Sequence, residues 1–177
     1  AAISEVMPEN AIYVEETITH RQPIQRHISW SQAQSYFHPS GGLGMGLGQA
    51  LGVKLAAPER PVLALVGDGS FLYNPIVPAL GAAKEIGLPI LIVVFNNGNY
   101  SAMKGSHLDF YPQGVAANTG IFHGVNISGP DYSTLIQPFG GYGERVEDPA
   151  EVKPALERAL AAVSSGQTAL LDVVLSR

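Results

Sequence analysis

Two short polar motifs follow two apolar runs of the sequence, and their residue types suit a metal ion. Gly67-Asp68-Gly69 follows the run 62–66, and Asn96-Asn97 follows the run 90–95. Mg²⁺ takes oxygen ligands in near-octahedral geometry and is usually held by few protein groups together with phosphate oxygens. One carboxylate and one amide oxygen on adjacent strand ends therefore predict a magnesium diphosphate site, with Asp68 as the charged ligand and Asn97 as a neutral one.

Residues beside these motifs add features of a phosphate site. Gly69 lacks a Cβ, so its backbone can approach a phosphate closely, and the segment from Ser70 can present free N–H groups at the start of a helix. Gly98 would allow a turn that directs the carbonyl of Asn99 back at the ion. Each motif alone is more often an ordinary turn, but their occurrence after consecutive strands favours the metal site.

Alternating strands and helices are expected to position the motifs. Continuous apolar runs are typical of strands covered on both faces, and strands are expected over residues 11–14, 62–66, 90–95 and 169–175. Helices are expected over 46–57, 75–86 and 149–163, with Asp148 as the N-cap of the last. This order predicts an α/β fold with a doubly wound, mainly parallel sheet and helices on both faces. Ligands of such sheets bind beyond the carboxyl ends of the strands, where Asp68 and Asn97 fall.

Other polar residues have a more ordinary interpretation. Residues 98–128 carry Gly, Ser, Asn and Pro without a sustained period, which predicts a long loop over the site. Glu15 and Glu16 follow the first strand and are expected at a solvated strand end. The histidines at positions 20, 27, 38, 107 and 123 lack metal-ligand spacing and are expected on the surface or in loops. His38 and His107 are the exceptions if one of them moves protons.

Composition and charge exclude several classes of protein. The 177 residues are 46% hydrophobic without a break in composition, which predicts one domain. A net charge of -5 without a basic run argues against binding to nucleic acid or to an anionic membrane. No apolar stretch approaches the roughly 20 residues of a membrane span, and no export signal is visible. The absence of cysteine excludes disulfides and thiolate chemistry and fits the cytoplasm.

Two nucleotide-binding motifs are absent from the glycine-rich stretch 41–52. In each of its registers the last position of the dinucleotide fingerprint Gly-x-Gly-x-x-Gly is not glycine. The P-loop pattern of nucleotidases is also missing from the sequence. A Rossmann dehydrogenase and a P-loop nucleotidase are therefore not expected.

The same motifs resemble a known family. Gly-Asp-Gly, 26 further residues (70–95) and Asn-Asn match the fingerprint of thiamine diphosphate enzymes. The stretch 40–52, followed by 58–61, resembles the same region of benzoylformate decarboxylase and, less closely, of acetolactate synthase. The resemblance extends from Met7 to the final strand. The chain is thus similar to the diphosphate-binding, C-terminal domain of the thiamine diphosphate-dependent 2-oxo acid decarboxylase and acetolactate synthase family.

This resemblance implies roles for individual residues. Asp68, Asn97 and the Asn99 carbonyl would hold Mg²⁺. The expected contacts of thiamine diphosphate are Thr19, Gly41, Leu43, Gly67, Asp68, Gly69, Ser70, Asn97, Asn99 and Tyr100. Gly41 and Leu43 are the expected catalytic residues: the Gly41 carbonyl would accept a hydrogen bond from the pyrimidine amino group, and Leu43 would hold the two rings in a bent conformation. Ala102 and Met103 would line the substrate pocket. Ile18 stands where the family has a hydroxyl residue, so one diphosphate hydrogen bond is expected to be absent.

The implied activity is decarboxylation of a 2-oxo acid, with acetolactate synthase-like carboligation as the alternative and a non-catalytic cofactor-binding module as a lower one. In this family a glutamate from a pyrimidine-binding domain activates the cofactor, and nothing in these residues matches that domain. We therefore expect residues 1–177 to form only the thiamine diphosphate-binding domain, without the pyrimidine-binding and middle domains. The choice of 2-oxo acid and any use of FAD would depend on residues outside the chain.

The expected partner is a pyrimidine-binding domain or subunit, within a homo-oligomer, dimer or tetramer, when full length. The missing initiating Met and the helix-like segment 1–6 favour a fragment over a separate subunit. Little or no turnover is expected from the chain alone, because it lacks the activating glutamate.

Overall fold

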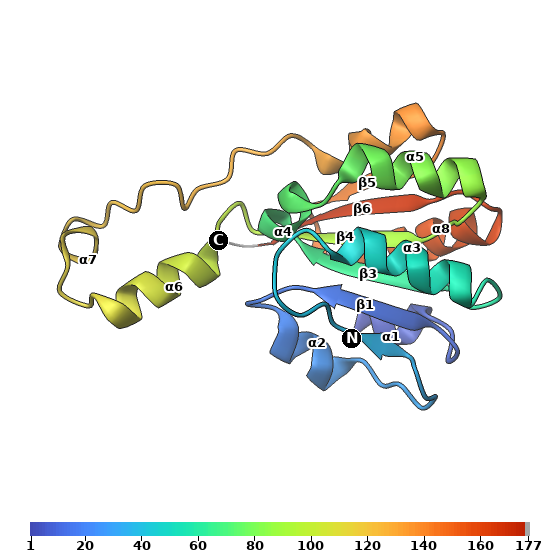
Figure 1. The fold of residues 1–177 in the computed structure, drawn as a ribbon, viewed down its shortest axis with the longest axis horizontal. Coiled ribbons are helices and arrows are strands. Elements are labelled where there is room, and N and C mark those ends of the chain that lie inside the picture. Colours follow the sequence, from blue (N-terminus) through green and yellow to red (C-terminus); the bar gives the residue numbers. More distant parts are fainter. Residues whose placement is uncertain (176–177) are drawn as a thin grey trace.

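Six parallel strands form the centre of the fold in the computed structural model, which describes residues 1–175 (Figure 1). The strands are β1 (Ile12–Glu16), β2 (Tyr36–Phe37), β3 (Val62–Gly67), β4 (Leu91–Asn96), β5 (Tyr142–Val146) and β6 (Ala169–Val174). Their order in the sheet is β2-β1-β3-β4-β6-β5. Every pair of neighbouring strands is parallel, which confirms the predicted doubly wound, mainly parallel sheet.

The strand register brings the carboxyl ends of the central strands to one edge. Glu16 at the end of β1 pairs with Val66 of β3, and Gly67 of β3 pairs with Phe95 of β4. The residues that follow β3 and β4 therefore emerge side by side. This edge carries the Gly-Asp-Gly and Asn-Asn motifs.

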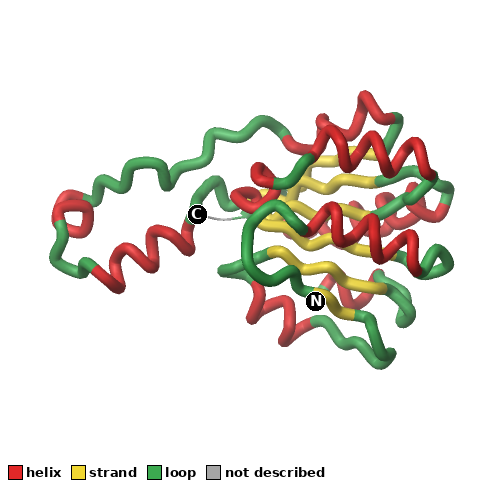
Figure 2. The backbone as a smooth tube through the Cα atoms, in the orientation of Figure 1, coloured by secondary structure: helices red, strands yellow, loops and turns green. Residues whose placement is uncertain are grey.

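Helices cover both faces of the sheet (Figure 2). One face packs against α1 (Ala2–Val6), α2 (Arg21–His27) and α8 (Val152–Ser164). The other packs against α3 (Gly46–Ala56), α4 (Asp68–Tyr73), α5 (Ile76–Ile86) and the 3-10 helix η1 (Tyr132–Phe139). Each face of the sheet forms a hydrophobic core with its helices, and successive strand residues point to opposite faces. Leu63 and Leu65 pack in the core with α8, and Ala64 and Val66 pack in the core with α3.

The predicted elements are confirmed where the apolar pattern is strong. The four predicted strands correspond to β1, β3, β4 and β6, and the three predicted helices to α3, α5 and α8. The side chain of Asp148 accepts a hydrogen bond from the Ala150 N–H at 2.9 Å, at the start of the short 3-10 helix η2 (Pro149–Glu151) that leads into α8. The edge strands β2 and β5 were not predicted, because one has two residues and the other is largely polar.

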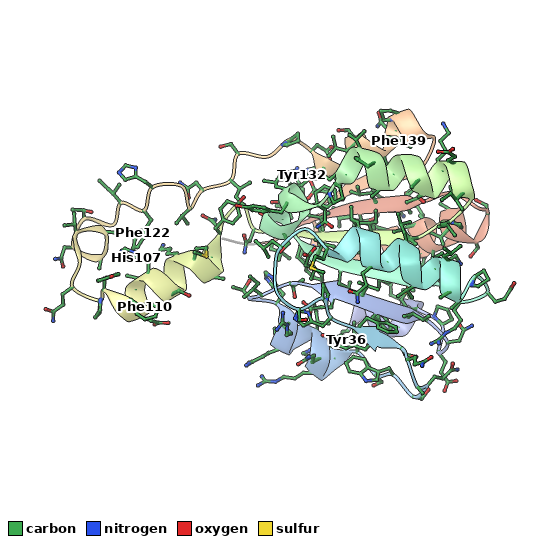
Figure 3. The ribbon with its side chains drawn as sticks, viewed as in Figure 1. Tyr36, His107, Phe110, Phe122, Tyr132 and Phe139 are labelled. Carbon is green, nitrogen blue, oxygen red and sulfur yellow. The ribbon has the colours of Figure 1, made fainter. Side chains whose placement is uncertain are left out.

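The predicted long loop over the site is wrong. Residues 99–130, which we call the arm, contain α6 (Ser101–Phe110) and α7 (Val115–Thr119) and extend away from the sheet (Figure 1). Neither helix has a buried residue, so no core-facing stripe marks them in the sequence. The arm packs mainly on itself: the rings of His107 and Phe122 meet edge to face at 5.9 Å (Figure 3). Among residues 1–175 no helix has the length and apolar character needed to cross a membrane.

Candidate cofactor site

A cavity of about 70 Å³, open to solvent, lies at the carboxyl edge of β3 and β4. All predicted site residues except Gly41 line it. They are Thr19, Leu43, Gly67, Asp68, Gly69, Ser70, Asn97, Asn99, Tyr100, Ala102 and Met103. The cavity is also lined by Ile18, His20, Phe95 and Ser101. Segments far apart in the sequence are therefore brought together at the place where the two motifs meet.

Asp68 is the buried carboxylate of this cavity. It is the first residue of α4 and is 3% exposed. One carboxylate oxygen accepts a hydrogen bond from the Gly69 N–H at 2.9 Å, and the other accepts one from the Gly98 N–H at 2.8 Å. Burial raises the pKa of the Asp68 carboxyl, and these donors oppose that shift. A bound cation would favour the ionised form that burial penalises.

The turn after β4 presents two further oxygen atoms. The Asn97 Oδ1 accepts a hydrogen bond from the Asn99 N–H at 2.9 Å, and Gly98 adopts a left-handed φ of +65°. The two hydrogen bonds at the root of the arm use the Gly98 carbonyl and the Tyr100 N–H. Within residues 1–175 no hydrogen bond engages the Asn99 carbonyl. That carbonyl, the Asn97 amide and the Asp68 carboxylate are oxygen atoms of cavity residues and stay the predicted ligands.

The start of α4 gives the cavity its anion-binding character. The N-cap residue Gly67 has no side chain to cap this helix, and the Asp68 carboxylate takes the Gly69 N–H of its first turn, which leaves the Ser70 N–H for a ligand. The structure gives another reason for glycine at position 69 than the approach of a phosphate: a Cβ there would lie 2.7 Å from the Tyr100 ring. Its contact with a phosphate stays a prediction.

The expectation that Glu16 lies at a solvated strand end is wrong. Glu16 is 4% exposed and holds the glycine-rich loop. One carboxylate oxygen accepts from the Gly44 and Met45 N–H groups at 2.7 and 2.9 Å. The other accepts from the Gly46 N–H at 3.0 Å and from the Asn74 amide at 2.8 Å. The loop so held carries Leu43, which lines the cavity.

The same expectation is wrong for Glu15, which is fully buried. Its carboxylate accepts hydrogen bonds from the backbone and hydroxyl of Thr17, from Arg21 at 3.1 Å and from the Tyr36 hydroxyl at 2.9 Å. His38 lies 3.4 Å from it and also contacts the Glu15 carbonyl at 2.9 Å. Burial raises the pKa of Tyr36 to about 12. Glu15 therefore joins α2, β2 and the entry to the glycine-rich loop.

His20 lies in a turn, within the expectation of a surface or loop position, but its place in the cavity was not predicted. Its ring stacks on Phe95 with a centroid distance of 5.5 Å. Burial lowers the pKa of His20, and the charge of Asp68 opposes that shift. The signal that could have found it is its position next to Thr19, an expected cofactor contact. Gly41, by contrast, lies exposed with a φ of +113° and does not line the cavity, so its proposed hydrogen bond stays a prediction.

The donor set fits a magnesium diphosphate group. It offers one carboxylate, one amide oxygen and one carbonyl, which leaves coordination positions for phosphate oxygens. In the part of the chain that the structure describes, no cluster of three or more His, Cys, Asp or Glu side chains is placed to hold a metal. The cavity is also lined by the apolar side chains of Ile18, Leu43 and Met103. A ligand with a charged diphosphate and less polar rings matches this mixed lining.

Comparisons with known proteins agree with this geometry. The family model described as "Thiamine pyrophosphate enzyme, C-terminal TPP binding domain" matches residues 19–173. Benzoylformate decarboxylase of Pseudomonas aeruginosa is 30% identical over 161 residues, which are 90% of this chain and 29% of that protein. The acetolactate synthase large subunit of Buchnera aphidicola is 34% identical over 137 residues, which are 76% of this chain and 23% of that protein.

A solved structure extends the similarity to three dimensions. The thiamine diphosphate-dependent 4-hydroxybenzoylformate decarboxylase of Rhodococcus jostii RHA1 superposes with a TM-score of 0.86 and 33% identity. The match covers 99% of this chain and 31% of that one. The chain therefore spans about a third or less of the length of these relatives.

Proposed function

The chain belongs to the thiamine pyrophosphate enzyme family, as its C-terminal cofactor-binding domain. From this premise we propose that Asp68, Asn97 and the Asn99 carbonyl hold the Mg²⁺ of thiamine diphosphate. The observation that carries the proposal is that these three residues line one cavity beside the start of α4. Gly67, Gly69 and the backbone at Ser70 would contact the diphosphate.

The remaining cavity residues would orient the cofactor and the substrate. When bound, thiamine diphosphate supplies the electron sink that decarboxylation of a 2-oxo acid requires. Leu43 would lie against its rings, with the Gly41 carbonyl near the pyrimidine amino group. Thr19 and Tyr100 would contact the cofactor. Ala102 and Met103, at the root of the arm, would line the substrate side and exclude water from it.

For the whole enzyme we propose decarboxylation of a 2-oxo acid, as in the benzoylformate decarboxylases that the chain resembles. The 34% identity to an acetolactate synthase supports carboligation as the second candidate. A pyrimidine-binding domain or subunit would supply the activating glutamate. The full enzyme would be a homo-oligomer, working in the cytoplasm. Residues 1–177 would form one domain with little turnover by itself.

A calorimetric titration tests the metal assignment. Thiamine diphosphate is titrated into the chain with and without Mg²⁺, for the wild type, Asp68→Asn and the control Asp109→Asn, which lies exposed on the arm. We expect Mg²⁺-dependent binding by the wild type and the control, and a loss of affinity of at least about 100-fold in Asp68→Asn. Equal affinity of wild type and Asp68→Asn would refute the assignment of Asp68.

A further inference from the structure

Asp172 is a buried carboxylate that does not line the cavity. It lies in β6 and is fully buried. Its Oδ1 accepts a hydrogen bond from the Asn96 Nδ2 at 2.9 Å. Its Oδ2 accepts from the Tyr132 N–H at 3.2 Å and pairs with the Arg145 guanidinium at 3.0 Å. One carboxylate thus holds residues just before and just after the arm.

A continuous set of hydrogen bonds leads from Asp172 to the proposed metal site. The Asn96 Oδ1 accepts from the Gly98 N–H at 3.2 Å. The same N–H donates to the Asp68 carboxylate at 2.8 Å. Asn96 therefore lies between Asp172 and the turn that carries Asn97. It is the first residue of the Asn-Asn motif, and it is not among the cavity residues.

Asp172 determines which way the Asn96 amide faces. An ionised carboxylate only accepts hydrogen bonds, so it holds the NH₂ group of Asn96 and leaves the amide oxygen for the Gly98 N–H. A flipped amide would place NH₂ against that N–H, donor against donor. The bond to Gly98 helps to fix the turn whose Asn97 amide and Asn99 carbonyl supply oxygen ligands.

We propose that Asp172 is a positioning residue for the metal-binding turn 96–99 and that it acts through Asn96. The proposal rests on the proposed function, because it assumes that this turn binds Mg²⁺ with thiamine diphosphate. Asp172 touches neither group. Its contribution is the preformed geometry of the turn, as residues behind metal ligands provide in other sites.

The decisive measurement is the Mg²⁺ concentration that gives half-maximal binding of thiamine diphosphate, compared between the wild-type chain and Asp172→Asn. The amide that this substitution introduces can present a donor to Asn96, which favours the flipped orientation of the Asn96 amide. We expect the Mg²⁺ midpoint to rise about 10- to 100-fold. Arg145→Gln is the matched control: it removes a partner of the same carboxylate but leaves the Asn96 bond. We expect it to lower the Tm and leave the Mg²⁺ midpoint unchanged.

A second variant keeps the test decisive if Asp172→Asn does not fold. Asn96→Ala, at a half-buried position, removes the same link and should also raise the Mg²⁺ midpoint. In the Asn96→Ala background, Asp172→Asn should have no further effect on the midpoint. A lower Tm with an unchanged midpoint in Asp172→Asn and Asn96→Ala would overturn the inference. Failure of the wild type to bind thiamine diphosphate with Mg²⁺ would instead overturn the proposed function.

Discussion

Glu16 and Asp68 lie at the carboxyl ends of neighbouring strands, and both are almost completely buried, at 4% and 3% exposure. Glu16 accepts four hydrogen bonds from the chain, from Gly44, Met45, Gly46 and Asn74. The Asp68 carboxylate accepts two, and it faces the cavity. Because a carboxylate has about four lone-pair positions, Glu16 is saturated and Asp68 is not. A saturated carboxylate belongs to the scaffold, and an unsaturated one beside a cavity is available to a ligand.

The largest effect that tests this comparison is expected from Glu16→Gln. The new NH₂ group faces backbone N–H groups or the Asn74 amide, so buried donors lose their acceptor. We expect the free energy of unfolding to fall by about 3 kcal/mol, measured by urea denaturation. Glu5→Gln is the control, because Glu5 forms an exposed ion pair with Lys153 and its loss should have little effect. An unchanged stability in Glu16→Gln would show that the scaffold role is wrong.

A smaller effect is expected at Gly46, which leaves no room for a side chain beside Glu16. A Cβ on Gly46 would lie 2.8 Å from the Glu16 carboxylate, so Gly46→Ala must displace it. We expect a loss of about 1–3 kcal/mol in the free energy of unfolding. Gly48→Ala, two residues along the same helix, meets nothing within 4 Å and should stabilise the chain by about 0.5–1 kcal/mol. Equal changes in the free energy of unfolding of both variants would mean that the contact with Glu16 does not affect stability.

Asp68→Asn should cost much less stability than Glu16→Gln. Burial raises the folded-state pKa of Asp68 above its ordinary value of 3.8. Its contribution to stability is therefore fully present below pH 3.8 and is lost as the pH rises through the raised value. The introduced amide removes the buried charge, but its NH₂ group faces the N–H of Gly69 or of Gly98, so we expect the metal-free variant to lie within about 1 kcal/mol of the wild type at neutral pH. Denaturation at several pH values measures the difference, which should shift in favour of the wild type toward acid.

Ligand addition provides the control for that prediction. Mg²⁺ and thiamine diphosphate together should raise the Tm of the wild type and leave that of Asp68→Asn unchanged, because only binding to the folded state stabilises it. A metal-free Asn variant that is several kcal/mol less stable than the wild type would place Asp68 in the scaffold with Glu16.

The sequence predicted the parts of the fold that depend on local patterns. Continuous apolar runs located β3 and β4, and the positions of Asp68 and Asn97 at the ends of these runs predicted that the two residues share one edge. The roles of Glu15 and Glu16 depend on donors from distant segments, such as Gly44 and Asn74, and no local pattern contains them. An acidic residue after a buried strand has the same local appearance whether it is solvated or saturated.

The arm and His20 were missed for a related reason. The helices α6 and α7 bury no side chain, so their sequence lacks the apolar period by which helices are recognised. His20 becomes a cavity residue only because α2 begins beside Phe95 and Asp68. The positions of residues along the sequence can predict a set of ligands at the ends of consecutive strands. They do not predict which distant segment packs against those ligands.

The smallest effect concerns Tyr132, a buried polar group that is neither saturated nor open to a ligand. Its hydroxyl has no hydrogen-bond partner within residues 1–175, and burial raises its pKa to about 12. The raised pKa means that its contribution to stability is complete below pH 10 and is lost as the pH rises from 10 toward 12. Tyr132→Phe should therefore match or slightly exceed the wild type in free energy of unfolding at about pH 8, and lose less of it at about pH 11. Tyr111→Phe, on the exposed arm, should follow the wild type at both pH values. A clear loss in Tyr132→Phe at the lower pH would reveal a partner for the hydroxyl, and Tyr132 would then join Glu16 among the saturated groups.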